Sequence, residues 1–160
     1  MFEALGTAPN TAIQGYLNDN MVSYRVESRI YAHYILETLP DAKIAVLYQN
    51  DDFGKDYLIG LREGLGDKAD TLIVATQSYE TTDPTVDSQI VALKASGANV
   101  LLTAAVHKFA AQGIRKVYDI GWKQILSSVA NAVGSVMGLA GLEKGVGIIS
   151  ATYAKDPTDP

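Results

Sequence analysis

The stretch KIAVLYQNDDFG, residues 43–54, joins a short apolar run to two carboxylates, an aromatic side chain and a glycine. The run KIAVLY has the length and β-branched content of a buried strand. The residues after it can begin a helix, because Asp52 can cap a helix that starts near Gly54. The stretch therefore predicts a buried strand that passes directly into a helix, which is typical of an α/β fold.

The same pattern recurs along the chain. Helix-period segments separate four further apolar runs: TLIVATQSY (71–79), NVLLTAAV (99–106), QILSSV (124–129) and GVGIISATY (145–153). Gly66 and Gly97 stand where left-handed helix caps belong. Strands that are apolar throughout suit a sheet covered on both faces. Right-handed crossovers then predict an open, doubly wound, parallel five-stranded sheet in a three-layer αβα arrangement.

The part before residue 43 differs from the rest. SYRVESRIYAHYILETLPD, residues 23–41, predicts a helix with Val26, Ile30, Tyr34 and Ile35 turned inward. Residues 1–22 suggest a short helix that is followed by no strand. We expect residues 23–160 to form a single α/β lobe, and residues 1–22 to be an N-terminal helix or the remnant of another lobe.

Composition excludes several classes of function. The chain has 160 residues, no cysteine and a formal charge of −5, with 48% hydrophobic residues. The composition is that of a folded protein, and no cluster of Lys and Arg residues could form a basic surface stripe. Nucleic acid is therefore not a predicted partner. Without cysteine there is no disulfide, thiolate chemistry or cysteine-bound zinc. No apolar run reaches the ~20 residues of a membrane span, and MFEALGTAPN does not resemble a secretory signal.

In an open parallel sheet, ligands bind at the carboxyl ends of the strands. A phosphoacceptor is disfavoured there, because the third run ends LLTAAV without a carboxylate. Neither glycine-rich nucleotide motif is present. Asp51, Asp52 and Asp56 lack the order of a calcium loop, so no metal or cofactor is expected. His107 stands at a strand exit, but no serine lies in a nucleophile elbow, so we do not expect an enzyme.

Four blocks resemble the type I periplasmic solute-binding proteins, specifically the branched-chain amino-acid-like receptors of ABC transporters. They are KIAVLYQNDDFGKDYLIGLREGL, TTDPTVDSQIVALKASGANVLL, KFAAQGIRKVYDIGW and GIISATYAKDPTDP, and the resemblance covers about residues 20–160. In that family two α/β lobes close on a ligand. The resemblance implies a periplasmic location, a small-molecule ligand, a transporter permease as partner, and that this chain is the second lobe with half a binding site.

The resemblance also implies which positions meet the ligand. Phe53 stands where the family often places an aromatic side chain that stacks on the ligand. No acid stands at residues 127–135 to meet an ammonium group, which favours a carboxylate or aromatic acid over an α-amino acid. The candidate ligand-binding residues are Tyr24, Asp52, Phe53, Thr103, Ala104, Val106, His107, Ser127, Ser128 and Asn131.

Two hypotheses of different classes follow. In the first, the chain is one lobe of a non-catalytic receptor for an amino acid or an aromatic or carboxylic acid, and it needs the missing first lobe to enclose that ligand. In the second, it is an isolated flavodoxin-like lobe or scaffold with no competent site of its own. In either case the lobe surface that a partner lobe would cover is a candidate for self-association.

Overall fold

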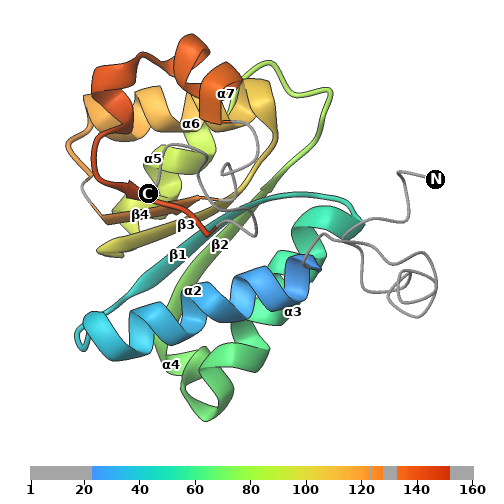
Figure 1. The fold of residues 1–160 in the computed structure, drawn as a ribbon, viewed down its shortest axis with the longest axis vertical. Coiled ribbons are helices and arrows are strands. Elements are labelled where there is room, and N and C mark those ends of the chain that lie inside the picture. Colours follow the sequence, from blue (N-terminus) through green and yellow to red (C-terminus); the bar gives the residue numbers. More distant parts are fainter. Residues whose placement is uncertain (1–22, 123, 128–132, 152–160) are drawn as a thin grey trace, which may run out of the picture.

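The computed structural model describes residues 23–151 except 123 and 128–132, and strands and helices alternate along them (Figure 1). The order confirms the predicted α/β pattern. The elements are α2 (Tyr24–Thr38), β1 (Ile44–Gln49), α3 (Asp52–Leu65), η3 (Gly66–Lys68), α4 (Ala69–Leu72), β2 (Ile73–Tyr79), α5 (Asp87–Ala95), β3 (Val100–Ala104), α6 (His107–Asp119), β4 (Gln124–Ser127), α7 (Val133–Ala140), η5 (Leu142–Gly145) and β5 (Ile148–Ile149). Residues 1–22 and 152–160 lie outside the described residues, as do the predictions made for them.

The strands form an open sheet in the order β2-β1-β3-β4-β5, and all four neighbouring pairs are parallel. The predicted open parallel sheet flanked by helices is confirmed most fully by β2, β1 and β3. The far side is slighter than expected, because β4 has four residues and β5 has two. In the described part of the expected fifth strand over 145–153, the strand residues are Ile148 and Ile149.

β1 and β3 are buried almost throughout, since every residue of the two strands except Tyr48 falls in the buried class. One hydrophobic cluster contains Leu47, Leu101 and Ile90, and the other contains Val46, Leu102 and Leu61. Helices α5, α6 and α7 cover one face of the sheet, and α2 and α3 cover the other (Figure 1). Alternate side chains of each strand thus point into different cores, which is why both strands read as continuous apolar runs.

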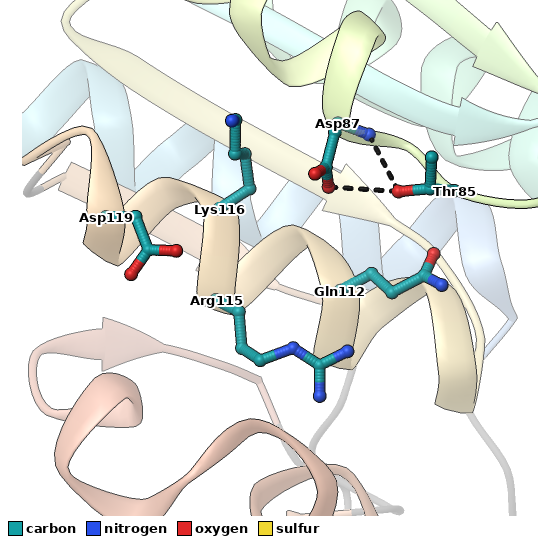
Figure 2. Close-up of a pocket in the computed structure, with 6 residues that line it drawn as sticks. All are labelled: Thr85, Asp87, Gln112, Arg115, Lys116 and Asp119. Carbon is teal, nitrogen blue, oxygen red and sulfur yellow. Dashed lines mark hydrogen bonds between the residues drawn. The ribbon is translucent and has the colours of Figure 1, made fainter.

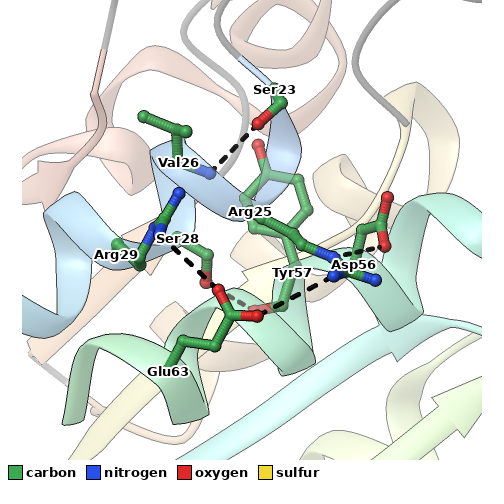
Figure 3. A network of polar contacts seen from close by, with 8 residues as sticks. All are labelled: Ser23, Arg25, Val26, Ser28, Arg29, Asp56, Tyr57 and Glu63. Carbon is green, nitrogen blue, oxygen red and sulfur yellow. Dashed lines mark hydrogen bonds and ion pairs between the residues drawn. The ribbon is translucent and has the colours of Figure 1, made fainter. Parts of the chain in front are cut away.

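α2 and α3 pack closely because α3 presents glycine to α2. A Cβ atom on Gly60 would lie 2.4 Å from the carbonyl oxygen of Arg25 and 2.6 Å from its Cα. A Cβ on Gly64 would lie 2.6 Å from that of Ala32. We call the contact surface between α2 and α3 the seam, and Figure 3 shows polar contacts along it. Arg25 Nε lies 3.0 Å from the Asp56 carboxylate, and the Ser28 hydroxyl donates to the Tyr57 carbonyl at 2.6 Å.

This seam also explains an error in the predicted face of α2. The buried residues are Ser28, Tyr31, Ala32 and Ile35, whereas Val26 and Ile30 are 38% and 49% exposed. The prediction that Val26 and Ile30 point inward was wrong. Small side chains at Ser28 and Ala32 are needed where α3 approaches, so the buried stripe is rotated away from the most apolar one.

We expect Gly60→Ala to lower the free energy of unfolding by about 2 kcal/mol or more, because its new methyl group would overlap the backbone of Arg25. Urea unfolding measures the change. Gly138→Ala in α7 is the matched control, because nothing lies within 4 Å of a Cβ built there. That change should leave stability unaltered or raise it by up to about 1 kcal/mol. Equal effects of the two substitutions would contradict the close seam.

Candidate functional site

Parallel pairing brings the strand exits to one side of the sheet. Gln49 is in register with Tyr79, Tyr48 with Ala104, and Thr103 with Ser127. We call this row of exits, with the helix starts that follow it, the carboxyl edge. It is the side on which an open parallel sheet binds its ligands.

The turn from β1 into α3 is tighter than the sequence predicts. Asp51, not Asp52, is the helix cap, and its carboxylate accepts from the Gly54 N–H at 3.0 Å. Asp52 is the exposed first residue of α3. A Cβ on Gly54 would lie 2.0 Å from the carbonyl oxygen of Gln49, so only glycine lets the helix start directly over the end of the strand. The predicted capping role of Asp52 was therefore wrong, while its place at the carboxyl edge stands.

A buried tyrosine that sequence reasoning missed ties three strand exits together. The Tyr79 hydroxyl donates to Gln49 Oε1 at 3.0 Å and accepts from the Val106 N–H at 3.2 Å. The Gln49 side-chain amide in turn donates to the Asp51 carboxylate. Burial raises the pKa of Tyr79 to about 12, so its hydroxyl stays protonated and keeps donating at neutral pH. The ends of β1, β2 and β3 are thus held as one unit.

His107 is placed by an unusual backbone. It is the first residue of α6, its side chain is exposed, and its φ is +30°, a positive value that is uncommon for residues other than glycine. Such a conformation costs roughly 1–3 kcal/mol and persists only where the surroundings enforce it. The residue before it is held by the hydrogen bond from the Val106 N–H to the Tyr79 hydroxyl. Val106 itself is 36% exposed beside His107.

Three of the predicted residues lie behind the edge. Thr103, Ala104 and Ser127 are 6%, 0% and 0% exposed. The Thr103 hydroxyl donates to the Ser127 hydroxyl at 2.8 Å, and the Ser127 carbonyl accepts from the Ser150 hydroxyl at 2.6 Å. These groups brace β3 against β4 and the chain after β5. Ser128 and Asn131 lie outside the described residues.

On the other side of the edge, α2 and α3 bring aromatic rings together. Tyr24 and Phe53 meet edge to face with ring centroids 4.8 Å apart, and Tyr24 stacks on Tyr57 at 5.5 Å. Phe53 also contacts Tyr57, at 5.3 Å. The predicted pair Tyr24 and Phe53 thus lies side by side, and both rings contact the Tyr57 ring, which is 1% exposed.

A carboxylate lies beside these rings. Burial raises the pKa of Glu27, and hydrogen bonds from Tyr57 and Tyr31 oppose that rise. The Tyr31 hydroxyl lies 3.0 Å from both Glu27 Oε1 and the Ser127 carbonyl oxygen, and it accepts from the Ala151 N–H at 3.0 Å. Burial and the Glu27 charge raise the pKa values of Tyr31 and Tyr57. The spacing of Tyr24, Glu27 and Tyr31 on one helix face was the available signal for this group.

Two surface hollows are lined by residues other than the predicted ligand-binding residues. One, of about 240 Å³, is lined by the residues in Figure 2: Thr85, Asp87, Gln112, Arg115, Lys116 and Asp119. The other, of about 450 Å³, lies around Tyr118 and Trp122. No strand exit lines either hollow. Within the described residues, no group of three or more acidic or histidine side chains could hold a metal ion. The chemistry gathered at the carboxyl edge is that of aromatic rings, hydroxyls, carboxylates and one histidine.

Comparison with known proteins gives a consistent result. A family model described as periplasmic binding protein matches residues 7–160. A substrate-binding periplasmic protein from Ralstonia solanacearum superposes with a TM-score of 0.68 at 27% identity, covering 79% of this chain and 36% of that one. A search of curated proteins found no match.

Two further solved structures share the fold at lower identity. One is a putative branched-chain amino acid ABC transporter protein from Rhodospirillum rubrum, with a TM-score of 0.70, 16% identity, and coverage of 83% of this chain and 38% of that one. The other is a fatty acid ABC transporter substrate-binding protein from Thermomonospora curvata, with a TM-score of 0.67, 21% identity, and coverage of 82% and 34%. The chain therefore spans little more than a third of the length of these proteins. None of the helices that the structure describes is long and apolar enough to cross a membrane.

We expect Tyr79→Phe to lower the free energy of unfolding by about 1–3 kcal/mol, because the Val106 N–H and the Gln49 side chain both lose a buried partner. Urea unfolding measures the loss, and hydrogen exchange at the Val106 amide should quicken. Tyr118→Phe is the matched control, since that residue is 53% exposed and its change should stay within about 0.5 kcal/mol. An unchanged exchange rate of the Val106 amide would contradict the role of the Tyr79 hydroxyl as its hydrogen-bond acceptor.

Glu27 predicts a specific dependence of stability on pH. Because its pKa is raised by folding, its contribution is full below the ordinary Glu pKa of about 4.3 and is lost as pH rises through the folded value. Glu27→Gln should therefore gain stability relative to the native chain on going from about pH 3.5 to about pH 8. Urea unfolding of both proteins at each pH isolates this difference, since other groups titrate alike in both. A gain in the opposite direction would contradict the assignment.

Proposed function

Because the chain belongs to the periplasmic binding protein family, we propose that it forms one lobe of a solute-binding protein that serves an ABC transporter in the periplasm. The family binds small solutes and is not catalytic. In this proposal residues 23–160 make the lobe, β4 and β5 complete a five-stranded sheet, and residues 1–22 belong to an N-terminal helix or to the other lobe. The partners are a first lobe and a transporter permease.

One observation carries the proposal: described candidates from four segments of the chain lie at one edge of the sheet. Tyr24 and Phe53 are in contact there, and Val106 and His107 are exposed at the exit of β3. The rings offer faces for stacking, and the imidazole offers a donor or acceptor. We propose that these residues meet the ligand, together with Asp52, Ser128 and Asn131.

The buried residues have a supporting role in this mechanism. Thr103, Ala104 and Ser127 would form the floor behind the ligand. The hydrogen bonds of the Tyr79 hydroxyl would keep that floor rigid. Closure of two lobes by a hinge would then be stabilised by ligand contacts to both faces. A rigid edge lowers the conformational cost of binding, because fewer side chains need to be ordered when the ligand arrives.

The ligand in this proposal is a small amino acid or an aromatic or carboxylic acid. One lobe alone encloses less of the ligand than a closed pocket does, so binding should be weak. The burial of Thr103, Ala104 and Ser127 favours a second candidate, an isolated flavodoxin-like lobe with no competent site of its own. The two candidate functions differ in whether any solute binds at the carboxyl edge.

Nuclear magnetic resonance titration of the full chain with amino acids, benzoate-type acids and short fatty acids tests the proposal. We expect one class to shift the amide signals of Phe53 and His107 saturably at millimolar concentration. Phe53→Ala and His107→Ala should each weaken that response about tenfold, equivalent to ~1.4 kcal/mol. Val91→Ala, on the exposed face of α5, is the control. Absence of saturable shifts with every class would favour the scaffold.

A further inference from the structure

β2 is an edge strand of the sheet. It pairs with β1 on one side, and among the described residues no strand pairs with its other side. At seven residues it is the longest strand of the sheet. An edge of this kind presents a row of unpaired N–H and C=O groups that can accept a further strand.

The sequence of β2 lacks most devices that protect such an edge. Residues 71–79, TLIVATQSY, contain no charge, no proline and no glycine between Asp70 and Glu80. Val74 is 40% exposed, and Thr76, Gln77 and Ser78 are exposed as well. Uncharged segments of high β-propensity without proline are those that pair most readily with other chains. The one irregularity is the register shift beside Val74, which leaves residues 75–79 as a regular ladder.

The direction of the backbone shows which residues of β2 would form hydrogen bonds with an added strand. The Tyr79 carbonyl accepts from the Asn50 N–H at 2.9 Å, so the backbone of Tyr79 faces the β1 side. Backbone groups alternate in direction along a strand, and those of Gln77 therefore also face β1. The N–H and C=O groups of Thr76 and Ser78 then face outward, away from the sheet.

We propose that β2 pairs antiparallel with β2 of a second copy of this chain, with the two-fold axis at Gln77. A closed two-fold dimer needs the same surface on both copies, and two identical edges meet antiparallel under that symmetry. Centring on Gln77 uses the regular ladder 75–79 and sets Thr76 opposite Ser78 of the second copy. Each of these pairs exchanges two backbone hydrogen bonds.

Charge favours this register over its neighbour. With the axis at Gln77, Glu80 faces Val74 of the second copy and Asp70 faces Pro84, so no two carboxylates are opposed. With the axis at Ala75, Asp70 would face Glu80, and like charges directly opposite each other are destabilising. Because the residues at the centre of β2 carry no charge, β2 of a second copy fits this edge better than a strand with charged residues would.

The dimer would leave the carboxyl edge free. The antiparallel pairing extends the sheet sideways and turns the carboxyl edges of the two copies in opposite directions. Each copy could still meet a ligand or a first lobe there. This surface also differs from the lobe interface as a route to self-association, so the two can be tested separately.

Sedimentation equilibrium of the full chain over micromolar to millimolar concentration tests the proposal. The native chain should dimerise. Thr76→Lys, which places a charge on the edge, and Thr76→Pro, which removes an outward N–H, should each weaken dimerisation by about tenfold or more. Circular dichroism checks that the variants are folded. Val91→Lys adds the same charge on the exposed face of α5 and should dimerise like the native chain.

Hydrogen exchange gives a second readout. The amides of Thr76 and Ser78 should become protected only as the concentration rises, whereas those of Gln77 and Tyr79 should be protected throughout. A chain that stays monomeric at millimolar concentration would overturn the proposal. So would a dimer that survives Thr76→Lys but is lost in Val106→Lys at the carboxyl edge, or protection of Thr76 and Ser78 at every concentration, which would mean that the chain covers its own edge.

Discussion

The burial of β1 and β3 on both faces is the constraint on which the rest of the structure depends. Val46 and Leu47, adjacent in β1, are each 0% exposed although they point into different cores. A strand can be buried on both sides only if helices cover each face, and helical crossovers between neighbouring strands make those strands parallel. Parallel strands end at the same side, so the position of the candidate site follows from the burial of the sheet.

The seam between α2 and α3 determines what stands at one side of that edge. Gly60 and Gly64 let the two helix backbones come close, and this closeness brings Tyr24 onto Phe53 and Tyr57. The ion pair of Arg25 with Asp56, whose side chain is 5% exposed, lies along the same seam. Helix packing thus places Tyr24 and Phe53 edge to face at the carboxyl edge, in contact with the buried Tyr57. In the proposed function, the aromatic wall of the site is a product of helix packing.

Hydrogen bonds between strand exits determine what stands at the other side. The Tyr79 hydroxyl joins Gln49 to Val106, and the Thr103 hydroxyl joins Ser127. Next to these bonds, His107 has a positive φ and an exposed side chain. The carboxyl edge therefore combines buried, hydrogen-bonded residues with a few exposed groups. In the proposed function, this arrangement lowers the entropy cost of binding a ligand.

Features encoded by neighbouring residues could be predicted from the sequence. The apolar runs predicted the strands, and the predicted cap glycines Gly66 and Gly97 have positive φ values of 56° and 81°. The position of the carboxyl edge followed from the predicted parallel direction of the strands. The sequence did not reveal that Asp51 rather than Asp52 caps α3, because that depends on how tightly Gly54 presses on Gln49.

Features that join distant parts of the chain were decided only by the tertiary structure. Tyr79 meets Gln49 across 30 positions, and Tyr31 meets Ser127 across 96. Val26 and Ile30 looked like core residues yet are exposed, since α3 requires small side chains on the buried face of α2. The sequence by itself determined the α/β alternation and the edge where function is sought, because hydrophobic period and capping are local. Which side chains face that edge and which lie beneath it depended on contacts between helices and strands, whose geometry no local pattern contains.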